Sequence, residues 1–208
     1  MAKVGASANV AVNEPPQVVV IAGPNGAGKT TYAEALLTAM KVPHFVNADR
    51  IAQGLSGQRP ETVALSAGRI MLERLRQLGS ERESFGFETT LSSRSFALFL
   101  RRLANDGYKV RIFYLMLPSA AESLRRVRLR VKLGGHDIPR EVIYRRFGRS
   151  AHNLFNLYMP LADSWRISEN VWASKPQKPH LVARGGADGP EILDEIKWQQ
   201  LQRIATNG

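Results

Sequence analysis

The chain has 208 residues, 44% of them hydrophobic and 23% charged, a balance that suits one globular domain and excludes wholesale disorder. It has no cysteine, which excludes disulfides and thiolate zinc sites, and its four histidines lack the close helical spacing of a zinc pair. The net charge of +11 indicates an anionic partner, such as nucleic acid, a phosphorylated metabolite or a membrane surface.

The start of the chain and its apolar runs predict the domain organisation. Residues 1–16 are small or polar and end in two prolines, so we expect a flexible arm before a single domain over 17–208. No apolar run approaches the roughly 20 residues that span a bilayer, and the opening lacks the apolar stretch of a secretory signal. We therefore expect a cytoplasmic protein without a membrane partner.

Predicted strands and helices alternate along the chain. Apolar runs rich in β-branched residues predict strands at 17–22, 44–48, 85–89 and 109–117, with weaker candidates at 165–169 and 181–184. Apolar residues at helical spacing predict helices over 30–40, 61–78, 95–103 and 191–204, and another beginning near residue 119. This alternation predicts an α/β fold with a mainly parallel sheet of five or six strands and helices on both faces.

The segment between the first strand and the first helix has the pattern GxxxxGK[ST]. In that context its backbone N–H groups can surround a phosphate, Lys29 can reach the β- and γ-phosphates, and the Thr30 hydroxyl can ligate Mg²⁺. A chance glycine-rich turn is the alternative, but the flanking strand and helix argue against it. The predicted ATP-binding residues are Gly23, Pro24, Asn25, Gly26, Ala27, Gly28, Lys29, Thr30 and Thr31.

The absence of a second motif, an acidic residue at the end of an apolar strand, indicates which class of nucleotide enzyme fits. Many ATPases have an apolar strand ending in Asp, which holds Mg²⁺ and activates water, whereas the strand at 109–117 is followed by Pro118. This favours a P-loop kinase, whose nucleophile is a substrate hydroxyl. Asp49 lies just past the strand at 44–48, where ligands collect in open α/β sheets, and can accept the hydroxyl proton. A helix N-cap for the turn at Arg50 is an equal alternative for Asp49.

The strand at 85–89 ends in a polar cluster on the same expected edge. A carboxylate within an apolar strand is costly unless it is paired, so Glu88 either forms an ion pair with an arginine or binds the substrate. We favour substrate binding, with Thr90 beside Glu88.

Most of the net positive charge lies in one segment. Residues 125–149 hold nine Lys and Arg against two acids and so contribute +7 of the net +11. Two glycines divide the segment into two predicted helices, with Arg130 on the first and Arg145 and Arg146 on the second. Such a hairpin can close over a triphosphate and neutralise charge on the transferred phosphoryl group. A nucleic-acid-binding patch and an ordinary solvated face are the alternatives.

Four ordered motifs together resemble the zeta-toxin family of small P-loop kinases: IAGPNGAGKTT at 21–31, VNADRIA at 46–52, FGFETTLSS at 85–93 and GGHDIPREVIYRRFGRS at 134–150. The resemblance covers roughly residues 17–186. It implies a kinase that uses ATP and Mg²⁺ to phosphorylate the 3′-hydroxyl of UDP-N-acetylglucosamine, in toxins that a small helical antitoxin holds inactive. The GGHDIP block belongs to a bacterial subgroup, so the resemblance supports the kinase more firmly than the sugar nucleotide.

The resemblance also implies roles for single residues. The phosphate-loop lysine falls on Lys29, the general base on Asp49, and the lid arginines on Arg130 and on Arg145 or Arg146. The predicted substrate-binding residues are Asp49, Arg50, Glu88 and Thr90, and the lid spans about 119–158. Two alternatives stay open: a kinase acting on NAD, an antibiotic or a nucleic-acid end, and an NTPase whose basic hairpin binds nucleic acid. Too few aromatic residues accompany the arginines for a single-strand platform, which makes nucleic acid the weaker partner.

Overall fold

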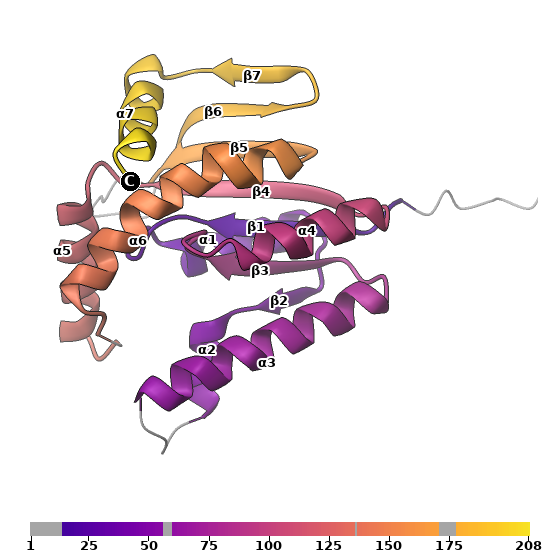
Figure 1. Cartoon of the computed structure of the whole chain (residues 1–208), viewed down its shortest axis with the longest axis horizontal. Coiled ribbons are helices and arrows are strands. Elements are labelled where there is room, and N and C mark those ends of the chain that lie inside the picture. Colours follow the sequence, from indigo (N-terminus) through magenta and orange to yellow (C-terminus); the bar gives the residue numbers. More distant parts are fainter. Residues whose placement is uncertain (1–13, 56–59, 136, 171–177) are drawn as a thin grey trace, which may run out of the picture.

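The computed structural model describes residues 14–55, 60–135, 137–170 and 178–208 (Figure 1). The strands are β1 (Gln17–Ala22), β2 (His44–Val46), β3 (Phe85–Thr89), β4 (Lys109–Met116), β5 (Ser164–Glu169), β6 (His180–Gly186) and β7 (Gly189–Ile192). The helices are α1 (Lys29–Ala39), α2 (Ala48–Gly54), α3 (Pro60–Ser80), α4 (Ser95–Asn105), α5 (Ala120–Lys132), α6 (Arg140–Asn153) and α7 (Glu195–Thr206). Two short helical turns follow α6, the π-helical η1 (Leu154–Tyr158) and the 3-10-helical η2 (Met159–Leu161).

The strands form one sheet in the order β2-β3-β1-β4-β5-β6-β7. The first five strands in this order run parallel, and β6 and β7 are antiparallel to their neighbours. The mainly parallel α/β fold that the alternating pattern predicts is therefore confirmed. The predicted flexible arm, residues 1–16, lies almost entirely outside the described residues, and β1 begins directly after it.

The last part of the chain differs from the prediction. The described residues form seven strands rather than five or six, and the closing helix begins at Glu195 rather than at 191. The extra strand, β7, lies exposed at the sheet edge, so no buried stripe marks it in the sequence. Asp194 starts the helix by accepting a 3.0 Å hydrogen bond from the backbone N–H of Lys197. The other predicted elements agree with the observed bounds to within two residues at either end.

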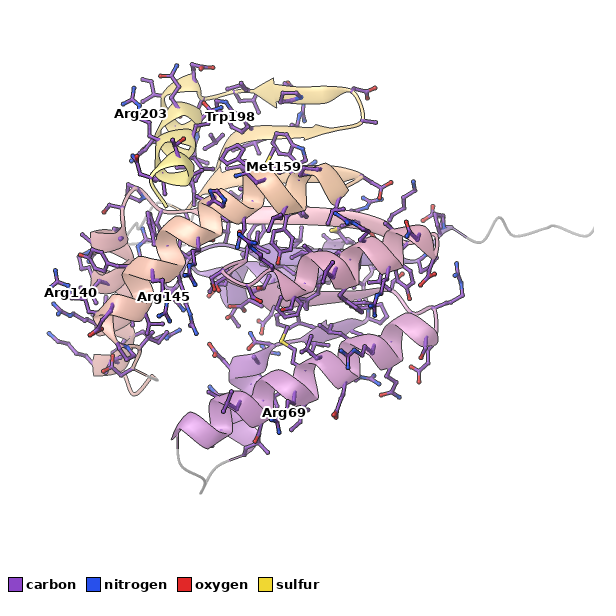
Figure 2. All side chains as sticks on the ribbon, in the orientation of Figure 1. Arg69, Arg140, Arg145, Met159, Trp198 and Arg203 are labelled. Atoms are coloured by element: carbon purple, nitrogen blue, oxygen red, sulfur yellow. The ribbon has the colours of Figure 1, made fainter. Side chains whose placement is uncertain are left out.

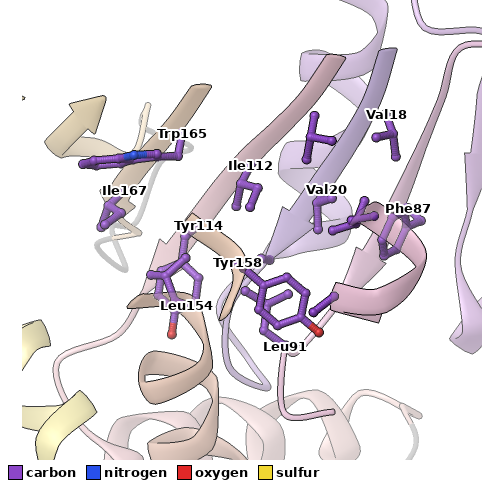
Figure 3. Packing of buried hydrophobic residues seen from close by; sticks show 14 of the residues in the cluster. Val18, Val20, Phe87, Leu91, Ile112, Tyr114, Leu154, Tyr158, Trp165 and Ile167 are labelled. Atoms are coloured by element: carbon purple, nitrogen blue, oxygen red, sulfur yellow. The ribbon is translucent and has the colours of Figure 1, made fainter. Parts of the chain in front are cut away.

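Residues of β1 alternate between two apolar cores, which explains its uninterrupted apolar sequence. Val18 and Val20 belong to the larger core, under α3, α4 and α6, whereas Val19 and Ile21 pack with α1 on the other face. At the far side of the larger core, Trp198 of α7 stacks on Trp165 of β5, with ring centroids 6.0 Å apart. Figure 3 shows the inner part of this core, where side chains of β1, β3 and β4 meet Leu154 and Tyr158 of η1.

The parallel strands define where a ligand site can form. Their carboxyl ends share one edge of the sheet, on the left in Figure 1, and α5 and α6 stand beside that edge. We call α5, α6 and the segment between them the basic hairpin. Among the helices of the described ranges, none has both the length and the apolar character needed to cross a bilayer.

Candidate active site

The loop between β1 and α1 has a backbone that its glycines make possible. Gly26 and Gly28 have φ angles of 78° and 82°, in the left-handed region that favours glycine. A Cβ atom at Gly28 would lie 2.4 Å from the amide nitrogen of Asn170, and one at Gly23 would lie 2.2 Å from the Leu115 carbonyl oxygen. The loop can therefore wrap closely, and its backbone N–H groups join the N-terminus of α1 as a site for an anion.

Side chains from α5 and from the end of β5 hold this loop in place. The Ser123 hydroxyl donates to the Asn25 carbonyl oxygen (2.6 Å), and the Asn170 amide donates to the Ala27 carbonyl oxygen (2.8 Å). Arg126, which is buried, donates in turn to the Asn170 carbonyl oxygen (2.9 Å). We did not predict Ser123 or Asn170; the available signals were a polar residue on the inner face of α5 and one just after a parallel strand.

Lys29 lies within the loop rather than in solvent. Its side chain is 7% exposed, and Nζ donates to the Pro24 carbonyl oxygen (3.0 Å) and lies 3.7 Å from a Glu88 carboxylate oxygen. Burial lowers the pKa of Lys29; the charges of Glu88 and Asp49 oppose this shift, and Arg130 adds to it. The structure thus brings Asp49 and Arg130, from α2 and α5, within electrostatic reach of the predicted phosphate-binding lysine.

Glu88 binds the same phosphate loop. One carboxylate oxygen accepts hydrogen bonds from the Thr30 hydroxyl and from the Asn47 side-chain amide, each 2.7 Å long. The other oxygen is the one that faces Lys29. A cation beside Glu88 is thus Lys29 of the phosphate loop, which gives the carboxylate an ion-pair partner.

Asn47, not Asp49, caps α2. The side-chain oxygen Oδ1 of Asn47 accepts from the backbone N–H groups of Asp49 (2.8 Å) and Arg50 (3.1 Å). The N-cap alternative for Asp49 is therefore wrong. Asp49 is the second residue of α2, and its side chain is exposed. Arg50 next to it forms an ion pair with Glu34 of α1.

The two adjacent arginines of α6 differ in their surroundings. Arg145 is exposed, whereas Arg146 is half-buried; Figure 2 shows Arg145 along α6, beyond Arg140 near the helix start. Burial lowers the pKa of Arg146, the charge of Arg145 adds to this shift, and the charge of Asp49 opposes it. Arg146 is thus within electrostatic reach of Asp49.

The loop after β3 joins the edge of the site to the end of α6. The Thr90 hydroxyl lies 2.8 Å from that of Ser92. The Asn153 amide donates to the Leu91 carbonyl oxygen (2.6 Å), and the Tyr158 hydroxyl donates to the Ser93 carbonyl oxygen (2.5 Å). Thr90 therefore lies on a loop that α6 and η1 hold, while Glu88 faces the phosphate loop.

The residues at this edge fit a magnesium ion that shares its ligands with a nucleotide. In the described residues no group of three or more His, Cys, Asp or Glu side chains could hold a metal on its own. A hydroxyl and a carboxylate 2.7 Å apart, Thr30 and Glu88, suit Mg²⁺, which keeps several waters and binds through one or two protein oxygens plus substrate phosphates.

Comparisons with known proteins agree with this architecture. An uncharacterized protein of Haemophilus influenzae is 26% identical over 131 residues, covering 63% of this chain and 92% of that protein. The AvrRxo1-ORF1:-ORF2 structure with ATP matches 91% of this chain at 20% identity and a TM-score of 0.67; this chain spans 63% of that chain's length. The PezAT toxin–antitoxin system of Streptococcus pneumoniae matches 93% of this chain and 85% of that chain, at 15% identity and a TM-score of 0.56.

These structural likenesses, together with the phosphate loop and the parallel sheet, show the fold of P-loop kinases. A model of the Zeta toxin family matches residues 3–165, which is most of the chain and includes the phosphate loop, Asp49, Glu88 and both arms of the basic hairpin. The chain therefore belongs to the Zeta toxin family.

Proposed function

We propose that this protein is a kinase that transfers the γ-phosphoryl group of ATP to a hydroxyl group of a small molecule. The observation that carries the proposal is the position of Asp49. It is exposed at the carboxyl edge of the sheet, within electrostatic reach of Lys29 in the phosphate loop and of Arg146 in the basic hairpin. An ionised carboxylate beside a phosphate site can accept the proton of an acceptor hydroxyl during phosphoryl transfer.

In the proposed reaction the phosphate loop binds the triphosphate through its backbone N–H groups and Lys29. Thr30 would hold Mg²⁺, which offsets phosphate charge when bound. Asp49 takes the proton of the acceptor hydroxyl while the oxygen of that hydroxyl forms a bond to the γ-phosphorus. The bond between the γ-phosphorus and the bridging β-phosphate oxygen breaks, and ADP leaves. Arg130 and one arginine of the pair at 145 and 146 neutralise charge on the transferred group, so the basic hairpin works as the lid, over about 119–158.

For the acceptor, we propose the 3′-hydroxyl of UDP-N-acetylglucosamine. Membership of the Zeta toxin family supports this choice, and Thr90 and Arg50 lie at the same edge as Asp49, where an acceptor would bind. The proposed cellular role is that of a cytoplasmic toxin with a small helical antitoxin as its partner. The likeness to the PezAT toxin–antitoxin system supports that role.

Asp49→Asn tests the proposed base, because the amide keeps the shape of the carboxylate but cannot accept the proton. We expect binding of a non-hydrolysable ATP analogue within about twofold of wild type, and transfer to UDP-N-acetylglucosamine lower by about 10³-fold. The matched control is Asp106→Asn, in the turn before β4 at the opposite edge of the sheet, which should transfer at the wild-type rate. Wild-type turnover by Asp49→Asn would remove Asp49 from the mechanism.

A further inference from the structure

We propose that Asn153, at the end of α6, is a positioning residue that fixes the loop between β3 and α4 for the acceptor. We call this loop, residues 90–94, the acceptor loop. The inference rests on the proposed kinase function and deepens it, because it names the residue that sets the geometry of the acceptor half of the site. The sequence predicted no role for Asn153.

The acceptor loop contains a residue with an unusual backbone conformation. Leu91 has a φ angle of 54°, in the left-handed region that residues other than glycine seldom adopt. Its side chain is completely buried in the larger core, and its backbone N–H donates to the Thr89 hydroxyl (3.1 Å). Such a conformation persists only where the surroundings hold it, and residues of this kind gather at ligand sites and active sites. Leu91 therefore points to a functional role for this loop.

Asn153 holds Leu91 from outside the loop. The Asn153 side chain is 4% exposed, and its amide donates a 2.6 Å hydrogen bond to the Leu91 carbonyl oxygen. Loss of this buried bond would be costly, because the carbonyl oxygen would lose its partner in a place that water hardly reaches. From η1, the Tyr158 hydroxyl donates a second bond, to the Ser93 carbonyl oxygen (2.5 Å). The two bonds together fix the middle and the end of the acceptor loop.

The loop that is held in this way carries two hydroxyls beside Leu91. Thr90 and Ser92 are half-buried, and their hydroxyl oxygens lie 2.8 Å apart. Each hydroxyl can donate and accept hydrogen bonds, which suits the hydroxyl groups of a sugar. Thr90 directly follows the carboxyl end of β3, at the edge of the sheet where Asp49 lies. The positions of these two hydroxyls therefore depend on Leu91, and through it on Asn153.

The same face of α6 carries a predicted lid arginine. Arg146, Ser150 and Asn153 follow one another at spacings of four and three residues, so they lie on one face of the helix. Ser150 is buried, and its hydroxyl lies 3.0 Å from that of Tyr114 in β4. This face is thus joined to the sheet at Ser150 and to the acceptor loop at Asn153. A single helix therefore sets the position of the acceptor loop relative to Arg146.

Steady-state kinetics of Asn153→Ala, with each substrate varied in turn, test this role. We expect the KM for UDP-N-acetylglucosamine to rise about tenfold and the KM for ATP to stay within about twofold of wild type, because only the acceptor half loses its fixed geometry. Asn153→Asp keeps the shape of the side chain, but a carboxylate cannot donate to the Leu91 carbonyl oxygen, so its acceptor KM should rise at least as much. A variant that had merely lost stability would contain fewer active molecules and keep both KM values.

Asn156→Ala is the matched control on the next turn. Asn156 is exposed, and its amide donates to the His152 carbonyl oxygen (2.9 Å) rather than to the acceptor loop, so both KM values should equal those of wild type. Tyr158→Phe keeps the buried ring and removes only the hydroxyl that binds Ser93. It should raise the acceptor KM about threefold, and it tests the proposal even if the Asn153 variants do not fold.

Hydrogen exchange followed by mass spectrometry separates this inference from the kinase function, because it needs no substrate. Peptides that contain residues 90–94 should exchange at least about fivefold faster in Asn153→Ala than in wild type, and Asn156→Ala should exchange like wild type. Unchanged exchange in Asn153→Ala, an acceptor KM within about twofold of wild type, or equal rises in both KM values would overturn the inference and leave the kinase function standing. A wild-type protein that transfers phosphate to no acceptor would instead refute the kinase function, and this inference with it.

Discussion

Asp49 is within electrostatic reach of a lysine of the phosphate loop and an arginine of the basic hairpin. The motif alone predicts Lys29, because glycines, lysine and threonine at fixed spacing form a phosphate site wherever a strand precedes and a helix follows. The sequence did not predict a role for Asn47. An asparagine before a helix indicates an N-cap, but nothing in the sequence indicates that its side-chain amide also donates a hydrogen bond to Glu88. That bond joins residues 41 positions apart, which only the packed sheet brings together.

The adjacent arginines of α6 give a prediction at the same scale. Arg146 is half-buried and interacts electrostatically with Asp49, whereas Arg145 is exposed. We therefore expect Arg146→Ala to lower phosphoryl transfer by about 10³-fold and Arg145→Ala by less than about threefold, when initial rates are measured at saturating ATP. Equal losses of transfer rate in the two variants would contradict this assignment. A larger loss in Arg145→Ala would make Arg145 the arginine that acts in the site.

Among the elements, α5 does more than carry arginines. Ser123 and Arg126 on its inner face hold the phosphate loop, directly and through Asn170, so α5 joins the loop to the end of β5. Sequence periodicity predicts that such a helix exists and which stripe is apolar, but it cannot say which loop the polar residues of that stripe will contact. The edge strand β7 was missed for a related reason, because its exposed residues leave no pattern.

An ion-pair cluster on α5 predicts how stability depends on pH. Glu122 accepts hydrogen bonds from Arg125 (2.7 and 2.8 Å) and Arg126 (2.6 Å). The bonds from Arg125 are the largest cause that lowers the pKa of Glu122, to about 2. Since the pKa is lower in the folded than in the unfolded state, Glu122 stabilises the fold at neutral pH, and this contribution is lost as pH falls from the ordinary Glu pKa of about 4.3 to about 2.

Urea unfolding of Glu122→Gln measures that contribution. The variant should be less stable than wild type at pH 7, and the difference should shrink steadily as pH is lowered from 5 toward 2.5. Glu73→Gln, on an exposed position of α3, serves as the control and should follow the wild-type curve. A difference between Glu122→Gln and wild type that stays constant with pH would show that ionisation of Glu122 does not stabilise the protein.

For the whole molecule, the position of the site follows from the order of strands. A parallel sheet collects the phosphate loop, α2 and the loop after β3 at one edge, and the basic hairpin, with +7 of the net +11 charge in residues 125–149, stands beside it. The alternating pattern is enough to predict that sheet and edge. It does not predict which residue of the edge faces phosphate and which faces acceptor, because the direction of each side chain depends on strand register.

The most direct test of a kinase site at this edge is phosphoryl transfer itself. Full-length protein is incubated with Mg²⁺ and γ-labelled ATP, with and without UDP-N-acetylglucosamine, and the label is followed by mass spectrometry. We predict a labelled monophosphate on the sugar nucleotide that is absent with Asp49→Asn. Binding of ATP without label transfer to UDP-N-acetylglucosamine or to any component of a bacterial metabolite extract would contradict the assignment of this site to a small-molecule kinase.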